Sequence, residues 1–392
     1  MHLAYPDYLD LVIDYALRTA AGEVVAKPGF ADKLVLEVDH MIQVVMRAKE
    51  NTYMVNWDVR TYNAAVGGQR GDKPEAEERL QRQFPTDRIS LEDPAVLEDV
   101  AGQIIAVYLP DAIVQHRREI ISSQMQTLGP TLDENLRGSS GSRGSRGSGG
   151  SRTGESAWRN ALKHFLPAHR ATVFGRGNVT ASPGWHAQGH FTFDHPLHVS
   201  GQLGPAPNKP ATPGHLAFQQ FMREHLETGC LMSVALALTH PEQYALTRAS
   251  LEKLSGLERF CERVREWSFA FNVLTIVANR ESILHRDKQS GGPVWIDALL
   301  TVGGDEDTVL ELPGVGARFR YRSGTIVLFC GHTQLHGVSP AFHERVCFAA
   351  YARPTVLRKL RFHIPEPPTI VSSDDHLYWL EYIKSLLDWA RN

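Results

Sequence analysis

The sequence predicts an α+β fold in which helices pack around a β-rich core. Apolar residues recur every three or four positions in the N-terminal part and near the C-terminus, which is the period of an amphipathic helix. Runs rich in β-branched and aromatic residues, separated by Gly- and Asp-rich turns, fill residues 272–351 and are typical of strands. The four cysteines have neither paired metal spacing nor the density of a disulfide framework. We therefore expect an ordinary hydrophobic core to stabilise the fold.

Residues 1–137 are expected to form a mainly helical region that packs on the core. Apolar side chains have helical spacing in three segments, residues 8–16, 34–46 and 96–108. Pro94 gives a start signal for the third of these helices. An independent domain that binds a partner is the alternative, and the sequence does not separate the two.

Residues 138–156 are expected to be a flexible linker, because Gly, Ser and Arg dominate their composition. The regular repeat favours an engineered replacement of a longer insertion, and a natural disordered tether is the alternative. Basic residues cluster in and after this segment, where they could follow a phosphate backbone. Outside the linker, the candidates for phosphate contacts are Arg159, Lys163, Arg170 and Arg176.

Residues 157–366 are expected to form the β-rich core, and residues 367–392 a C-terminal amphipathic helix that docks on it. Residues 174–213 are rich in Gly, Pro and His and should form loops with short strands. Two helical segments, residues 216–226 and 241–267, should then support the sheet. Four histidines fit no common zinc spacing and lack cysteine partners, so we favour ordinary roles for them over a metal site: His186, His190, His195 and His198.

The formal net charge of −3 argues against a nonspecific nucleic-acid binder of the histone type. No apolar run approaches the length of a membrane span, and the N-terminus lacks a signal pattern. We therefore expect an intracellular protein without a membrane partner.

A His-x-Asp motif followed by a distant histidine is the main functional signal. In a strand, His285 and Asp287 would project to the same face, because they lie two positions apart. A β-branched run, residues 324–330, ends shortly before His336 and can bring in a third ligand. Two histidines and one carboxylate with open coordination positions are the facial triad of non-haem Fe(II) oxygenases. His332 is a competing third ligand.

These residues resemble the TET/JBP family of 2-oxoglutarate- and Fe(II)-dependent dioxygenases, which oxidise the methyl group of modified bases in nucleic acid. The family's His-Arg-Asp motif is matched by residues 285–287, and its Gly-to-Cys apolar run with a following Leu-His-x-x-x-Pro by residues 324–340. Its Arg-initiated strand is matched by residues 345–353. The resemblance covers about residues 267–354. The family pattern places the third ligand directly before a Gly-Val-Ser-Pro-like stretch, which favours His336 over His332.

The resemblance implies a double-stranded β-helix with the active site in the mouth of the barrel. Fe(II) would be held by three residues: His285, Asp287 and His336. The far carboxylate of 2-oxoglutarate would meet Arg345, whose planar guanidinium can form a bidentate pair. Arg280 would be a second anchor, unless it is a solvated arginine at a strand end. Cys347 stands where the family has a small hydroxyl residue near the co-substrate, and O2 would take the remaining iron position.

The resemblance also implies a substrate, 5-methylcytosine in a methylated DNA duplex, with the target base flipped out of the helix. Tyr351 would stack on that base and Arg353 would bond its edge, although both could be ordinary surface residues. Arg353 replaces a family histidine, and residues 288–290 lack an evident polar counterpart. These departures leave the base open. Such a substrate implies a nuclear location.

Three alternatives to this substrate remain. The first is oxidative demethylation of N6-methyladenine or another N-methylated base, which needs the same iron chemistry. The second is hydroxylation of a small molecule or a protein. The third is an inactive module that only recognises modified DNA, against which the intact ligand set argues. The sequence does not predict the oligomeric state.

Overall fold

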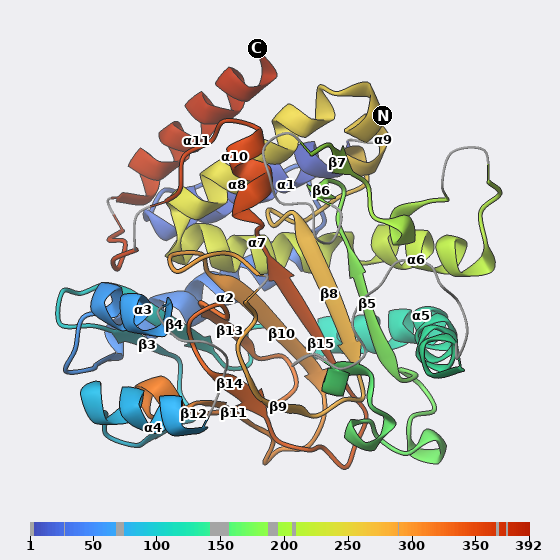
Figure 1. The fold of residues 1–392 in the computed structure, drawn as a ribbon. Helices are drawn as coiled ribbons and strands as arrows, with labels where there is room; N and C mark the ends of the chain where they lie inside the picture. Colours follow the sequence, from blue (N-terminus) through green and yellow to red (C-terminus); the bar gives the residue numbers. More distant parts are fainter. Residues whose placement is uncertain are drawn as a thin grey trace.

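The computed structural model describes residues 4–26, 28–67, 74–141, 157–186, 195–205, 209–288, 290–365, 368–373 and 375–392. In these residues, helices and mostly antiparallel strands form a mixed α+β architecture, so the α+β part of the predicted fold class is confirmed. Figure 1 shows the helices α1, α7, α8 and α11 gathered on one side of the strands. The predicted linker lies mostly outside the described residues, as does His190.

The larger sheet has eight strands in the order β1-β3-β4-β13-β10-β15-β8-β5. The β1–β3 pair is parallel, and its other pairs are antiparallel. The strands span Thr52–Met54 (β1), Ala95–Glu98 (β3), Ile104–Leu109 (β4), Ile326–Phe329 (β13), Asp297–Gly303 (β10), Arg345–Tyr351 (β15), Val273–Ala278 (β8) and Gly177–Ala181 (β5).

The smaller sheet has five strands in the order β2-β12-β11-β14-β9. They span Ile89–Leu91 (β2), Ala317–Arg320 (β12), Val309–Leu312 (β11), His336–Val338 (β14) and Ser282–His285 (β9). A separate two-stranded pair is formed by β6 (Trp185–His186) and β7 (Leu197–His198).

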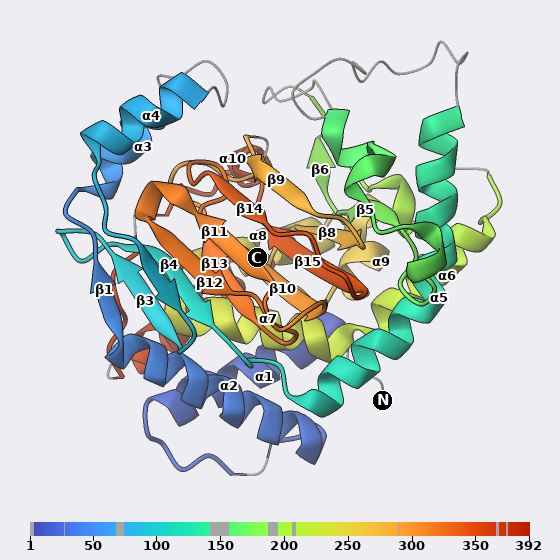
Figure 2. The same ribbon diagram turned by 90° about the horizontal axis from the view of Figure 1, so that it is seen from below.

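A helical layer covers one face of the larger sheet. It contains α1 (Tyr5–Ala20), α2 (Asp32–Glu50), α7 (Leu226–Thr239) and α8 (Pro241–Ser255). Figure 2 shows α1, α2 and α7 together beneath the strands. All residues of α7 from Thr228 to Thr239 are buried, as expected for a helix that is apolar on every side. This helix contacts α1, α2, α8 and β10, and it anchors the helical layer to the centre of the sheet.

A second hydrophobic core lies between the two sheets. It joins Tyr108 and Phe329 of the larger sheet to Leu310 and Phe319 of the smaller one. The rings of Tyr108 and Phe319 stack with their centroids 5.0 Å apart. The two sheets therefore pack face to face, and β9 and β14 form one end of the smaller sheet beside this core.

The N-terminal region is not only helical. Residues 96–108, expected as a helix, form the antiparallel strands β3 and β4. Asp99 accepts hydrogen bonds from the backbone N–H groups of Ala101 and Gln103, both at 2.8 Å, and Gly102 takes a positive φ of 74°. This turn creates a hairpin. Every residue of β4 is buried, so the strand lacks the alternation of apolar and polar residues that usually identifies one. The apolar residues of this segment therefore fitted the spacing of a helix.

The remaining helices frame the sheets. They are α3 (Val59–Gly67), α4 (Pro74–Gln83), α5 (Gln115–Gly141), α6 (Pro213–Glu224), α9 (Glu258–Arg265), α10 (Pro354–Lys359) and α11 (Asp375–Arg391). The segment expected as one helix over 241–267 is two, because α8 ends before Gly256. The C-terminal helix α11 packs on α8 and α1. None of the helices in the described part of the chain is long and apolar enough to cross a membrane.

Candidate metal centre

Three side chains predicted as metal ligands meet at the end of the smaller sheet. β9 and β14 are antiparallel, and their register sets His285 opposite His336. β9 ends at His285, so Asp287 reaches the cluster from the following turn, where its backbone N–H donates to the carbonyl of Gly331 at 2.8 Å. One potential ligand atom from each of the three residues lies within 4.8 Å of the others. His332 is not part of this group.

Each histidine faces a different oxygen of the same carboxylate. The Nε2 atom of His285 lies 3.6 Å from Oδ1 of Asp287, and the Nε2 atom of His336 lies 3.5 Å from Oδ2. The two imidazole rings have their centroids 4.3 Å apart. The donor set, two imidazole nitrogens and a carboxylate, is the one that suits non-haem iron. The arrangement can hold one metal ion.

Backbone carbonyls fix the tautomer of both rings. Nδ1 of His285 lies 2.7 Å from the carbonyl of Ile283, and Nδ1 of His336 lies 2.9 Å from that of Gln334. A carbonyl only accepts, so each Nδ1 must carry the hydrogen, and each Nε2 keeps its lone pair toward Asp287. Such outer contacts orient metal-binding histidines and set their basicity. Sequence reasoning did not predict these contacts, since they depend on the local backbone path.

The protonation states also suit metal binding. Burial, with the neighbouring His336, lowers the pKa of His285 to about 3. Burial opposes ionisation of Asp287, but the neighbouring His336, His285 and Arg159 hold its pKa well below the usual value. Metal ligands must be deprotonated, and these shifts keep His285 and Asp287 in that form near neutral pH.

A short segment after the linker covers the cluster. The 3-10 helix η1 (Ala157–Asn160) brings Nη2 of Arg159 to 2.5 Å from Oδ1 of Asp287. The ring of Trp158 meets His285 edge-on, with the centroids 4.9 Å apart. Arg159, a candidate for phosphate contacts, thus has its guanidinium paired with the carboxylate of Asp287 in this structure. Trp158 gave no sequence signal beyond being aromatic.

Two buried arginines lie beside the cluster. Nη2 of Arg345 donates to the carbonyl of Arg280 at 2.8 Å, and Nη1 of Arg280 donates to that of Arg159 at 3.1 Å. Their exposed fractions are 5% and 8%. Among the described residues, no carboxylate forms an ion pair with either arginine. Burial, followed by the charge of Arg159, lowers the pKa of Arg280 to about 10.

A cavity of about 210 Å³ opens onto both guanidinium groups, and Lys163 and Arg170 also line it. Buried cations without an acidic partner favour an anionic ligand. Cys347, two positions after Arg345 on β15, has its Sγ 3.6 Å from the hydroxyl of the buried Tyr321. Burial raises the pKa of Cys347, so the thiol is neutral. The sequence did not single out Tyr321.

The two residues predicted to contact a base lie farther along β15. Tyr351 is half-buried, and it follows Arg345 by six positions on the same face of the strand, about 20 Å away at the usual rise of an extended chain. Arg353 follows the strand, and its guanidinium lies over the ring of Trp185 at 5.2 Å. No hydrogen bond or ring contact in the described residues links Tyr351 or Arg353 to the metal ligands.

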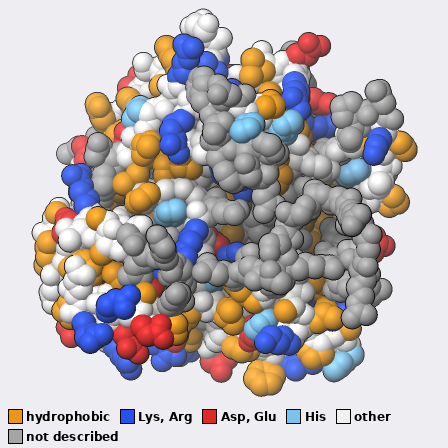
Figure 3. Space-filling model, viewed as in Figure 1, with side chains coloured by type: hydrophobic (Ala, Val, Ile, Leu, Met, Phe, Trp, Pro, Cys, Tyr) orange, Lys and Arg blue, Asp and Glu red, His pale blue; other side chains and the backbone are white. Residues whose placement is uncertain are grey.

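The other predicted phosphate contacts are also engaged. Arg170 bonds the carbonyl of Phe342 and lies over its ring, and Arg176 pairs with Asp133 at 3.3 Å. Figure 3 shows the described Lys and Arg side chains of this face dispersed among hydrophobic and acidic ones. Lys163 remains a candidate, beside the 210 Å³ cavity.

Comparison with known protein families places a segment of this chain in a class of enzymes. Residues 204–354 match the family described as the oxygenase domain of the 2OGFeDO superfamily, the 2-oxoglutarate- and Fe(II)-dependent dioxygenases. The matching family of that superfamily is Tet_JBP, so this segment is similar to a TET/JBP oxygenase domain, and the resemblance seen in the sequence is confirmed. The matched segment contains the three clustered side chains, Arg280 and Arg345. Trp158 and Arg159 precede it.

One similar solved structure is NgTET1 in complex with 5mC DNA, at a TM-score of 0.45 and 10% sequence identity. The similarity covers 81% of this chain and 91% of that chain. No curated protein sequence matches the chain.

Proposed function

We propose that this protein is a dioxygenase that uses Fe(II), 2-oxoglutarate and O2 to oxidise the methyl group of 5-methylcytosine in DNA. The observation that carries the proposal is the geometry of the cluster: two histidines with fixed tautomers direct their Nε2 atoms at the two oxygens of Asp287. The face-to-face sheets with a core between them support a double-stranded β-helix as the scaffold.

His285, Asp287 and His336 would hold the iron, because their donor atoms and protonation states fit it. When bound, iron and 2-oxoglutarate supply an oxidant made from O2, with decarboxylation of the co-substrate to succinate. Arg345 and Arg280 would bind the far carboxylate, which provides the acidic partner that both lack among the described residues. The neutral thiol of Cys347 would pack beside the co-substrate without adding negative charge near its carboxylates.

The protein's own part in the reaction is to position the substrate and exclude water. Trp158 covers one side of His285 and limits the access of solvent to that ring. A methyl group in a duplex is out of reach of a buried centre, so the base must leave the stack. Tyr351 would stack on the flipped base. Arg353 would donate to an acceptor on its edge, since a guanidinium has no lone pair to offer. A DNA substrate agrees with the expected nuclear location.

Mass spectrometry of nucleosides tests the proposal. The chain is incubated with Fe(II), 2-oxoglutarate and a duplex carrying 5-methylcytosine, and in parallel with a matched duplex carrying N6-methyladenine. We expect 5-hydroxymethylcytosine from the first duplex and none with His285→Ala. Loss of N6-methyladenine with release of formaldehyde would instead assign N6-methyladenine as the substrate base. Decarboxylation of 2-oxoglutarate without change in either duplex would support the oxygenase activity but reject DNA as the substrate.

A further inference from the structure

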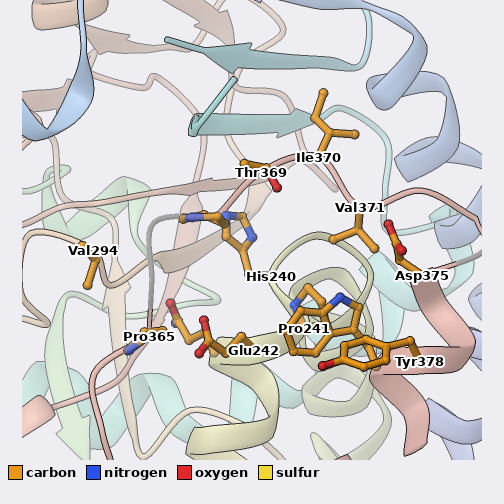
Figure 4. Close-up of a pocket in the computed structure, with 13 residues that line it drawn as sticks. His240, Pro241, Glu242, Val294, Pro365, Thr369, Ile370, Val371, Asp375 and Tyr378 are labelled. Atoms are coloured by element: carbon orange, nitrogen blue, oxygen red, sulfur yellow. The ribbon is translucent and has the colours of Figure 1, made fainter. Parts of the chain in front are cut away.

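A second cavity, of about 440 Å³, lies apart from the metal centre (Figure 4). It is enclosed by the N-terminus of α8, the first turns of α11 and the segment 368–371, and it shares no lining residue with the cavity beside Arg345. Its volume is in the range of small-molecule sites, about 300–1,000 Å³. Much of its wall is apolar, with prolines, Val294, Ile370 and Val371.

His240 places a hydrogen-bond acceptor in the wall of this cavity. The hydroxyl of Thr239 donates to the carbonyl of Ala235 at 2.6 Å, so its oxygen must accept from Nδ1 of His240, which lies 2.8 Å away. Nδ1 therefore carries the hydrogen, and Nε2 keeps a lone pair. The residue is only 2% exposed, and Nε2 has no partner among the described residues. Burial lowers the pKa of His240 to about 3, so the ring stays neutral.

The other polar side chains of the lining include two carboxylates, an amide and the hydroxyl of Thr369. Glu242 and Asp375 contribute carboxylates from α8 and α11, and Figure 4 shows them on two sides of His240. Gln243 is committed elsewhere, because its amide bonds both the N–H and the carbonyl of Ile296, at 2.8 and 2.7 Å. The rings of Tyr378 and Trp379 complete the wall, and aromatic faces attract cations.

Both carboxylates already have partners within the chain. Oε1 of Glu242 lies 3.1 Å from Nε2 of the exposed His363. Asp375 accepts from the hydroxyl of Ser372 at 2.7 Å. Lys49 lies behind the wall, where it donates to the carbonyl of Val371 at 2.9 Å, and burial lowers its pKa to about 8. The lining thus offers two carboxylates and one neutral imidazole acceptor, beside the hydroxyls of Thr369 and Tyr378 and the indole N–H of Trp379.

We propose that this cavity binds an organic cation with N–H donors, a guanidinium or primary ammonium group on an apolar stem. The cationic head would donate to Nε2 of His240 and pair with Glu242 and Asp375. The stem would lie against Trp379 and the prolines. The same chemistry is offered by a free amine and by an arginine or lysine side chain of another protein. The proposal is independent of the oxygenase activity, and binding is measured without iron.

Isothermal titration calorimetry of the full chain tests it with four probes on the same butyl stem: butylguanidinium, butylammonium, neutral butylurea and pentanoate. We expect saturable one-site binding of the two cations only. Glu242→Gln should weaken this binding by up to about fivefold, the effect of losing one partly exposed ion pair. Glu381→Gln is the matched control, since Glu381 lies farther along α11 and does not line the cavity. Cations that bind no better than butylurea, or binding unaffected by Glu242→Gln, would overturn the proposal.

Because His240→Phe could impair folding, the ring itself is the second readout. In a histidine-labelled chain, the ¹⁵N resonance of His240 Nε2 should shift when butylguanidinium binds, and it should not shift with butylurea. No shift at saturating cation would reject the role of His240 and leave water as the occupant. Tighter binding of N-acetyl-arginine amide than of agmatine would support the site and assign it to a protein side chain. The reverse order would support the site and assign it to a free amine.

Discussion

The guanidinium of Arg286 forms a bidentate ion pair with Glu77 of α4, through contacts of 2.5 and 2.9 Å. Its Nε donates to the carbonyl of Thr333 at 2.7 Å. Arg286 stands between two of the clustered residues, and Thr333 is three residues before the third, His336. Glu77 therefore ties both ligand-bearing segments to the N-terminal region. The pair is nearly buried, with side-chain exposures of 1% and 15%.

Glu77→Gln should weaken metal binding about 10- to 100-fold, the usual cost of removing an outer partner of a metal site. The variant leaves Arg286 without its carboxylate, so the turn that carries Asp287 loses its support. Titration with Co(II), followed by its visible absorption, measures the affinity without turnover.

The matched control for Glu77→Gln is Asp10→Asn. Asp10 pairs with the buried Arg248 at 2.8 Å, and neither residue lies in the candidate metal centre. Both variants should lower thermal stability, but only Glu77→Gln should lower Co(II) affinity. Equal Co(II) affinities in the two variants would show that Glu77 stabilises the fold without supporting the metal centre.

His336→Ala should abolish turnover and metal binding, as should His285→Ala and Asp287→Ala. His332→Ala should keep both, because the structure leaves this side chain outside the cluster. Iron content after anaerobic reconstitution distinguishes them. An inactive His332→Ala beside an active His336→Ala would reverse the assignment of the third ligand.

The cluster of His285, Asp287 and His336 was predictable from two local sequence patterns. The two-residue step from His285 to Asp287 keeps both side chains on one side even though β9 ends before Asp287. The β-branched run of β13 then signals a strand just before His336. The Arg280–Arg345 contact was partly predictable, since the family resemblance named both residues without saying that one donates to the carbonyl of the other.

The Glu77–Arg286 pair and the covering role of Trp158 could not be predicted. Each joins residues more than a hundred positions apart, and no local period encodes such pairings. The N-terminal strands were missed for a different reason. β4 is buried on both faces, so its apolar run lacks the alternation that distinguishes a strand from a helix.

Arg345→Lys should raise the concentration of 2-oxoglutarate needed for half-maximal decarboxylation. An ammonium cannot reproduce the two parallel bonds of a guanidinium to a carboxylate. The rate of decarboxylation without DNA is measured as 2-oxoglutarate is varied. Arg176→Lys serves as the control, because Arg176 pairs with Asp133 away from the cavity. An unchanged half-saturation in Arg345→Lys would remove this residue from the co-substrate site.

Acid should destabilise the fold in part through His225. Burial lowers its pKa to about 3, and the ring stacks on Phe221 with centroids 4.7 Å apart. The unfolded chain takes up this proton near pH 6.5 and the folded chain does not, so stability falls as the pH drops from about 6.5 toward 3.

In His225→Phe, the slope of unfolding free energy against pH in this window should be smaller by about 1.4 kcal/mol per pH unit. Urea unfolding at pH 7, 6, 5 and 4 measures the slope. Parallel curves for the two proteins would show that His225 is protonated equally in both states.

Tyr351→Ala should cost about 1–3 kcal/mol of substrate interaction, the usual value of a stack between one base and an aromatic ring. Co-substrate binding should be unchanged, because Arg345 lies about 20 Å along the strand. Tyr351→Phe keeps the ring and should be mild. Arg353→Ala should reduce oxidation of methylated DNA and change the preference between 5-methylcytosine and N6-methyladenine. Product yield on matched duplexes is compared with decarboxylation in the absence of DNA. If both alanine variants oxidise DNA as the parent does, the base is bound elsewhere, and the substrate assignment loses its support on β15.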